Sequence, residues 1–265
     1  MTDLDELENK SIYVIREAYS RCRRMAVLWS IGKDSTTLIW LCRKAFFGPP
    51  PFPVIHIDTG RKFAPIYAFR DRYAAEWNLD LLVARSERAA DHAPSFADKL
   101  ECCNELKTNA LKRTIAERRF EAVLLGIRRD EHGIRAKERF FSPRDGDFRW
   151  NYLDQPAELW DQYGSSSDPD AHLRVHPLLD WREIDVWRYV QREGIPVVDL
   201  YFARDGYRYR SIGCEPCCQP VVSEAATIEA IIEELRATRI AERSGRAQDK
   251  EQAYMMQKLR SLGYM

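Results

Sequence analysis

The stretch from residue 25 to residue 41 constrains the fold of this chain more than any other part of its sequence. An apolar run at 25–29 is followed by the short polar segment 30–36 and then by apolar residues at 37–41. The first run is typical of a buried strand, and the last is typical of the start of a helix. A tight loop between a strand and a helix turns its backbone N–H groups toward one point, where the positive end of the helix also lies. The stretch therefore predicts an α/β fold with an anion-binding loop after its first strand.

The loop at 30–36 carries the side chains that phosphate binding requires. Gly32 allows the backbone to approach a ligand closely, and Lys33 supplies a mobile cation. Hydroxyl groups come from Ser30, Ser35 and Thr36. The G-x-x-x-x-G-K-[ST] pattern of the Walker A loop is absent, so the loop belongs to another class. Taken alone, this stretch also fits an ordinary turn rich in small polar residues.

Further elements of an α/β fold are expected along the chain. Apolar runs predict strands at 54–57, 81–84 and 122–126, and periodic patterns predict helices at 5–24, from the loop to about 46, from a cap at Asp180, from Thr227 and in the charged tail. Strands that alternate with helices favour a mostly parallel sheet covered on both faces. The polar and aromatic segment 140–172 is expected to form a long loop over a site. We expect a nucleotide-binding α/β domain at 1–205, with a cysteine-containing loop and a helical tail at 206–265 packed on it.

Composition narrows the class of protein and its partners. Of 265 residues, 45% are apolar and 31% are charged, which is ordinary for a globular protein. Lys plus Arg equals Asp plus Glu at 41 each, so no overall charge favours nucleic acid or a membrane. The start of the chain is acidic, unlike a signal peptide, and no apolar run has a membrane helix's length. We expect a cytoplasmic protein without membrane association, in which seven cysteines do not form a disulfide framework.

Charged residues follow two of the other predicted strands. Asp58 comes after the strand at 54–57, and Arg128, Arg129 and Asp130 come after the strand at 122–126. The carboxyl ends of parallel strands meet at one edge of a sheet, where ligands collect. Asp58 is then a candidate ligand of Mg²⁺ or of a ribose hydroxyl, and the two arginines are candidates to clamp a phosphoryl group. Separately, a strand-end cap and a solvated basic face explain the same residues.

Motifs along nearly the whole chain resemble those of known families. The segment 30–36, Ser-Ile-Gly-Lys-Asp-Ser-Thr, resembles the PP-loop of ATP pyrophosphatases, which cleave ATP between the α- and β-phosphates. Apart from roughly 85–118 and 203–222, the chain resembles the small, catalytic subunit of bacterial sulfate adenylyltransferase, on the motifs at 56–63, 128–139, 156–160, 174–178 and 242–249. The resemblance implies the adenine nucleotide α-hydrolase-like three-layer sandwich of the phosphoadenylyl-sulfate reductase superfamily.

The same resemblance implies the residues of an ATP site with Mg²⁺. The PP-loop residues that would bind the phosphates are Ser30, Ile31, Gly32, Lys33, Asp34, Ser35 and Thr36. Asp58, Arg128, Arg129 and Asp130 would complete the catalytic site.

Four cysteines in two distant segments suggest a metal centre. They are Cys102 and Cys103, followed by Lys107, and the C-x-x-C pair Cys214 and Cys217. Four thiolates suit a [4Fe–4S] cluster, Zn²⁺ with four cysteines is the physical alternative, and buried structural thiols are the third explanation. The pattern is similar to the cluster site of iron–sulfur adenylyl-sulfate reductases, where the lysine lies near cluster and substrate. It departs from that family at Leu106, where an arginine is usual, and at the additional Cys218.

The absence of one cysteine separates this chain from those reductases. They attack their substrate with a cysteine in the C-terminal tail, but no cysteine follows Cys218 here. We therefore expect an ATP-cleaving, adenylylating enzyme. Our leading prediction is the ATP-pyrophosphatase component of a DNA phosphorothioation system, which this combination of motifs resembles and in which a cysteine desulfurase supplies sulfur. Cys218 is either an idle neighbour of the cysteine pair or a thiol able to receive that sulfur.

Two other functions compete with this prediction. The first is the catalytic subunit of sulfate adenylyltransferase, which works with a GTPase subunit. The second is a nucleotide-responsive iron–sulfur scaffold protein. Arg204, Arg208 and Arg210 beside the second cysteine pair are expected to steer an acidic partner or DNA, and a solvated basic loop explains them equally well.

Overall fold

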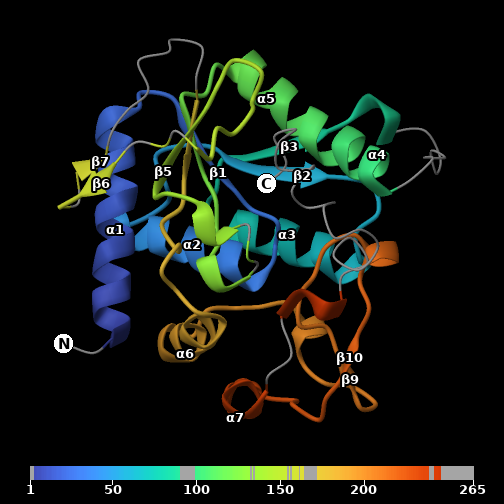
Figure 1. Ribbon diagram of the computed structural model, residues 1–265. Helices are drawn as coiled ribbons and strands as arrows, with labels where there is room; N and C mark the ends of the chain where they lie inside the picture. The colour runs from blue at the N-terminus through green and yellow to red at the C-terminus, as the bar shows by residue number, and fades with distance from the viewer. Residues whose placement is uncertain are drawn as a thin grey trace.

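The computed structural model describes residues 3–89, 99–131, 133, 135–153, 155, 157–160, 162–163, 172–238 and 242–245. Its centre is a six-stranded sheet with the strand order β3-β2-β1-β4-β8-β5 (Figure 1). The strands are β1 (Met25–Leu28), β2 (Val54–Asp58), β3 (Leu81–Arg85), β4 (Ala122–Leu124), β5 (Phe141–Arg144) and β8 (His172–Val175). Neighbouring strands are parallel except at the β5 edge, where β5 runs antiparallel to β8. The predicted α/β fold with a mostly parallel sheet is confirmed.

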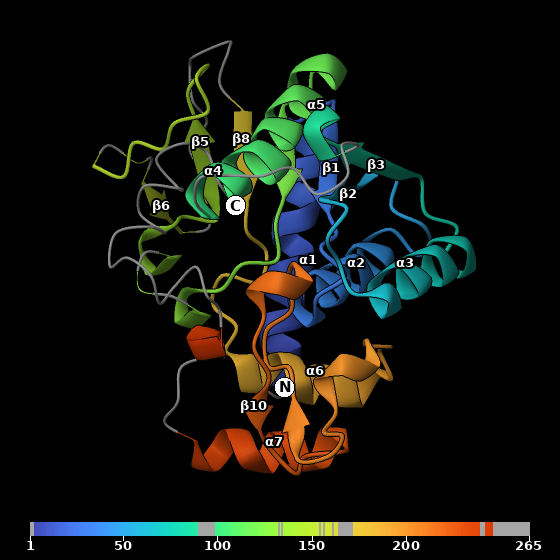
Figure 2. The same ribbon diagram turned by 90° about the vertical axis from the view of Figure 1, so that its right-hand side faces the viewer.

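Helices cover both faces of this sheet, which gives three layers (Figures 1 and 2). The helices are α1 (Asp3–Arg21), α2 (Lys33–Ala45), α3 (Ala64–Glu76), α4 (Lys99–Cys103), α5 (Ala110–Arg118), α6 (Glu183–Glu193) and α7 (Ile228–Ala237). One hydrophobic core joins α1, α2, α6 and α7 to the sheet, and a second, smaller core joins α5 to the opposite face. Because both faces are covered, β1, β2 and β4 are buried along their whole length.

Three smaller elements lie outside the main strands and helices. A π-helix, Asn104–Asn109, links α4 directly to α5. Short hairpins pair β6 (Glu158–Leu159) with β7 (Gln162–Tyr163) and β9 (Tyr207–Arg208) with β10 (Val221–Val222). The β9–β10 hairpin and α7 lie together beside α6 (Figure 2). Ile231 and Ile232 of α7 share the larger core, while the division at residue 205 stays a prediction.

Two expected elements differ from the observed ones, and a third lies mostly outside the described residues. The segment 140–172 was expected to be a loop, but it holds β5 and the β6–β7 hairpin. Helix α6 begins at Glu183 rather than after a cap at Asp180, because the Asp185 carboxylate accepts the Arg182 N–H at 3.0 Å. Asp180 instead pairs with Arg129. The predicted charged helix of the tail lies mostly outside the described residues. Among the described helices, none has the length and apolarity that crossing a membrane requires.

Candidate active site

The loop between β1 and α2 is compact because its own side chains close it. The hydroxyls of Ser30 and Ser35 lie 3.0 Å apart, and the Ser35 hydroxyl also donates to the Gly32 carbonyl at 3.1 Å. The Trp29 indole N–H donates to the Thr36 hydroxyl at 3.1 Å. Ile31 adopts a left-handed backbone with φ of 68°, which is uncommon for a branched residue, and its side chain is buried. The loop is therefore held in one conformation before any ligand binds.

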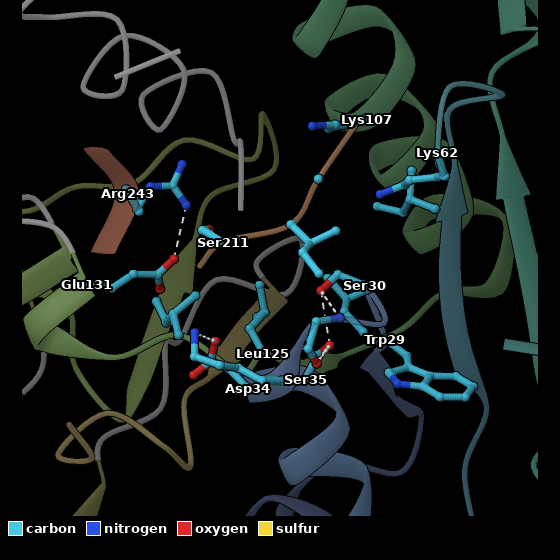
Figure 3. A pocket seen from close by; sticks show the side chains of 18 of the residues that line it. Trp29, Ser30, Asp34, Ser35, Lys62, Lys107, Leu125, Glu131, Ser211 and Arg243 are labelled. Carbon is cyan, nitrogen blue, oxygen red and sulfur yellow. Dashed lines mark hydrogen bonds and ion pairs between the residues drawn. The ribbon is translucent and has the colours of Figure 1, made fainter. Parts of the chain in front are cut away.

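A cavity of about 150 Å³ lies over this loop at the carboxyl ends of β1, β2 and β4. Ser30, Gly32, Lys33, Asp34 and Ser35 line its floor, and residues from several other segments of the chain form its walls (Figure 3). The charged wall residues are Lys62, Lys107, Glu131, Arg135 and Arg243. Four of those five are cations, so the cavity is suited to an anionic ligand.

Lys33 is the cation at the centre of this site. Its side chain is 1% exposed, and its ammonium lies 3.1 Å from an Asp34 carboxylate oxygen and in an ion pair with Glu242. Burial alone would lower the pKa of Lys33, but the Asp34 and Glu242 carboxylates outweigh it and raise that pKa. Lys33 is therefore a permanent positive charge at the helix N-terminus, where a phosphate would lie.

Arg128 lies behind the loop as a second buried cation. Its side chain is fully buried, and its guanidinium pairs with Asp34, Glu242 and Asp130, the last at 3.0 Å. The other oxygen of Asp130 accepts the backbone N–H of Glu183 at 2.8 Å. Asp130 thus fixes Arg128 and caps helix α6 at the same time.

Two other predicted site residues point elsewhere. Asp58 accepts hydrogen bonds from the Gly60 N–H at 2.8 Å and the Tyr67 hydroxyl at 2.9 Å, and it pairs with Arg85 at 3.1 Å. Burial would raise the pKa of Asp58, but these partners lower it. Arg129 pairs with Asp180. The structure therefore brings Lys33, Asp34, Arg128 and Asp130 together through ion pairs, with Lys33 and Asp34 lining the cavity. Asp58 and Arg129 neither line the cavity nor join this group.

Several residues of the site were not singled out from the sequence. Glu131 pairs with Arg135 and, at 3.0 Å, with Arg243 of the C-terminal segment, as the dashed line in Figure 3 marks. Gly126 packs so tightly on the loop that a Cβ there would lie 3.0 Å from backbone atoms of Asp34 and Ser35. Arg135, Glu242 and Arg243 lie within the family motifs at 128–139 and 242–249. Their place in these motifs is the feature of the sequence that could have identified them as site residues.

The four predicted metal-ligating cysteines meet in the structure. Cys102, Cys103, Cys214 and Cys217 line one small cavity, together with Lys107. The hydroxyl of Thr59 lies 3.3 Å from the Cys214 sulfur. Because Lys107 also lines the larger cavity, this π-helix residue connects the thiol cavity with the PP-loop cavity.

The two candidate metal centres place different demands on these four thiols. In the described part of the chain, no group of three or more His, Cys, Asp or Glu side chains is placed to hold a single metal ion. A tetrahedral zinc site needs all four sulfurs about 2.3 Å from one centre. A four-iron cluster takes one thiolate on each iron and so spreads its ligands further apart. The four cysteines that line one cavity are a donor set of the kind that either centre would require.

The expectation of an exposed basic docking surface is wrong for two of its three arginines. Arg208 is buried and pairs with Glu234 at 2.5 Å, and Arg210 is buried and pairs with Glu183 at 2.7 Å. Both arginines join the β9–β10 region to neighbouring helices, since buried guanidinium groups need such partners. Arg204 alone is exposed, where it pairs with Asp199.

The chain resembles known proteins over its whole length. It is 39% identical to a protein named sulfate adenylyltransferase subunit 2 from Geotalea daltonii, covering all of this chain and 98% of that protein. A protein of the same name from Methylococcus capsulatus matches with the same identity and coverage. These relatives are far closer to the chain than any of the solved structures described next.

Solved structures share the fold at low identity. Phosphoadenylyl-sulfate reductase from Candida auris covers 83% of this chain and 98% of its own, with 18% identity and a TM-score of 0.56. FMN adenylyltransferase from Candida glabrata, solved with FMN and the ATP analogue AMPCPP, covers 83% of this chain and 68% of its own, with 17% identity and a TM-score of 0.56. The phosphoadenosine phosphosulfate reductase domain matches residues 24–220. The chain therefore belongs to the phosphoadenosine phosphosulfate reductase domain family, and it is an enzyme of the PP-loop adenine-nucleotide type.

Proposed function

We propose that this enzyme transfers the adenylyl group of ATP to an oxyanion acceptor and releases pyrophosphate. The observation that carries the proposal is the pair of buried cations, Lys33 and Arg128, at the PP-loop and the N-terminus of α2. Fixed positive charges in a water-poor site stabilise phosphate oxygens more strongly than they would in water. The four further cations of the cavity wall suit an acceptor that is itself an anion.

The chemistry assigns a role to each group. An acceptor oxygen attacks the α-phosphorus of ATP, a new P–O bond forms, and the bond to the oxygen that bridges the α- and β-phosphates breaks. Pyrophosphate leaves with that bridging oxygen and its electron pair. Lys33 and Arg128 stabilise the charge that develops on it, and backbone N–H groups of the loop orient the phosphates. Mg²⁺ would be bound to the phosphates of ATP, where it would neutralise part of their charge.

We propose sulfate as the acceptor. Full-length relatives at 39% identity are named sulfate adenylyltransferase subunit 2, and their similarity supports sulfate ahead of the DNA phosphate that our sequence analysis preferred. Their name also implies another subunit. The partner under this proposal is a GTPase subunit, as the sequence resemblance suggests.

One observation favours DNA phosphorothioation as a second candidate. The four-thiol cavity adjoins the PP-loop cavity through Lys107, an arrangement for which sulfate activation has no evident use. We propose that Cys102, Cys103, Cys214 and Cys217 hold a [4Fe–4S] cluster. When bound, such a cluster supplies a redox-active centre beside Lys107. In this candidate function, a cysteine desulfurase provides the sulfur and a DNA phosphate oxygen is the acceptor.

Pyrophosphate release separates these functions. The anaerobically purified protein is given Mg-ATP with sulfate and a GTPase subunit, or with DNA and a cysteine desulfurase. We expect pyrophosphate to depend on sulfate; dependence on DNA and desulfurase would favour the second candidate. Release of ADP and phosphate would contradict adenylyl transfer altogether.

A matched pair of variants ties the activity to the loop. Lys33→Ala should lower the rate by about 10²–10³, the usual cost of removing a group that stabilises developing charge. Lys44→Ala is the control, because Lys44 lies on the same helix but pairs with Glu8 and Glu193 instead. An equal loss in both variants would show that the loop lysine has no special role.

A further inference from the structure

The carboxylate of Glu242 occupies the position between the two cations of the PP-loop site. One of its oxygens pairs with the Lys33 ammonium and the other pairs with the Arg128 guanidinium. Glu242 is itself buried, although it comes from the C-terminal turn Glu242–Gly245, more than two hundred residues beyond the loop. A carboxylate that bridges two cations presents the same oxygens and charge as part of a phosphate group.

All nitrogens of Arg128 are already engaged. Its Nε lies 3.0 Å from Asp130, one terminal nitrogen pairs with Asp34, and the other pairs with Glu242. The guanidinium has two further N–H donors, but the side chain is fully buried, so a phosphate oxygen reaches it only when one of the groups packed against it moves aside. The Lys33 ammonium is also engaged, because it contacts the carboxylates of Asp34 and Glu242.

Of those three carboxylates, Glu242 is the one that ATP can displace at least cost. Asp34 belongs to the first turn of α2, and Asp130 also caps α6 by accepting the Glu183 N–H. Moving either would disturb the loop or a helix end. Glu242 lies in a four-residue turn that Arg243 also attaches to the site, through Glu131 at 3.0 Å. Release of the Glu242 side chain leaves that second attachment in place.

We propose that Glu242 is a built-in competitor for the phosphates of ATP, and that nucleotide binding expels its carboxylate from Lys33 and Arg128. The inference rests on the proposed function, because it concerns the same phosphate site. In the nucleotide-free enzyme, Glu242 adds its negative charge to that of Asp34 beside two buried cations, because buried charge that is not fully balanced is costly. Part of the binding free energy of ATP is then used to break these two ion pairs. The C-terminal turn consequently reports on whether the site is occupied.

The test compares a ligand with phosphates and a ligand without them. Calorimetry measures the affinity of the wild type and of Glu242→Gln for AMPCPP with Mg²⁺ and for adenosine. Glutamine keeps the shape of the side chain but not its charge. We expect Glu242→Gln to bind AMPCPP about tenfold more tightly, because two charge-assisted contacts no longer compete, and to bind adenosine as the wild type does. Glu233→Gln, which removes an exposed carboxylate paired with Arg236, should change neither affinity.

The other possible results of this calorimetry distinguish failure of the inference from failure of the proposed function. If the wild type binds AMPCPP and Glu242→Gln binds it equally or more weakly, Glu242 is not a competitor and the inference is overturned while the proposed function stands. If neither protein binds AMPCPP, the proposed function fails and the inference fails with it. Unchanged adenosine binding verifies that the variant is folded. Should Glu242→Gln not fold, Glu242→Asp, whose shorter side chain reaches the two cations less well, must bind AMPCPP more tightly than the wild type.

Discussion

The backbone N–H of Lys33 donates a 2.9 Å hydrogen bond to the phenolic oxygen of Tyr201, which lies 168 positions further along the chain. Lys33 is the first residue of α2, so this N–H has no partner within the helix. Tyr201 ends a 3₁₀ turn and packs edge-on against Trp187 of α6, with ring centroids 5.4 Å apart. The conformation of the PP-loop therefore depends on a residue of the distant C-terminal half.

Removal of this hydroxyl should destabilise the protein. Tyr201→Phe leaves a buried backbone N–H without its partner, which costs about 1–3 kcal/mol of unfolding free energy. Urea denaturation of both proteins measures the difference. Tyr207→Phe is the control, because Tyr207 is 54% exposed and its variant should match the wild type. A Tyr201→Phe protein as stable as the wild type would contradict a supporting role for this hydrogen bond.

A methyl group at position 126 should disturb the loop directly. The Cβ of Gly126→Ala would meet the backbone of Asp34 and Ser35 at 3.0 Å, and backbone atoms cannot move aside as a flexible side chain can. We expect the loop to shift and the affinity for AMPCPP to fall by at least about tenfold, since small displacements in such sites have large effects. Gly48→Ala is the control because no atom lies within 4 Å of its added Cβ. Equal affinities in the two variants would argue against tight packing at Gly126.

The sequence was sufficient to locate most of the sheet. The strands predicted at 25–29, 54–57, 81–84 and 122–126 match β1 to β4 within two residues at each end. Three of them, β1, β2 and β4, are buried along their length, as parallel strands with apolar runs usually are, whereas β3 is only partly buried. Strand β8 escaped this rule, since His172 and Arg174 are buried in it despite their polarity. Strand β5 contains Pro143 and Arg144 and pairs only at the sheet edge, where such residues are tolerated.

For the site, too, the local sequence predicts some of the residues and only the tertiary fold identifies the others. The loop residues are adjacent along the chain, so their motif places them together. Asp58 ends β2 and Asp130 follows β4, two strands that lie on either side of β1, and both are carboxylates. Only their partners, Tyr67 and Arg85 for one and Arg128 for the other, decide which joins the site. Contacts such as Glu242 with Lys33 are set by tertiary packing, which no local pattern encodes.

Iron content tests the proposed cluster. Protein purified without oxygen should contain about four iron atoms per chain and absorb broadly in the visible range, as expected for a [4Fe–4S] centre. Cys217→Ser removes one proposed ligand and should lower the iron content sharply. Cys22→Ser is the matched control, because Cys22 is a buried thiol in the α1 side of the core, outside the four-thiol cavity. Stoichiometric zinc without iron would count against the cluster.

Acid should destabilise the protein through a buried histidine. His56 of β2 is fully buried, and its Nδ1 lies 2.9 Å from the Trp29 carbonyl oxygen. Burial, followed by the nearby Lys62 charge, lowers the pKa of His56 from 6.5 to about 4. The unfolded chain therefore binds a proton that the folded chain does not, so stability is complete above about pH 6.5 and falls as the pH drops toward 4.

The size of this effect follows from the shift in the pKa. At about pH 5, protonation of His56 in the unfolded chain should lower the unfolding free energy by about 2 kcal/mol. His56→Asn isolates the contribution, because an amide nitrogen can replace Nδ1 as the donor to Trp29 without titrating. Burial also lowers the pKa of His172 and His176, so some acid sensitivity should remain in the variant. Urea denaturation at pH 7 and pH 5 measures how far the unfolding free energy of each protein falls with pH. An equal fall in the wild type and in His56→Asn would mean that His56 is protonated in the folded protein at pH 5.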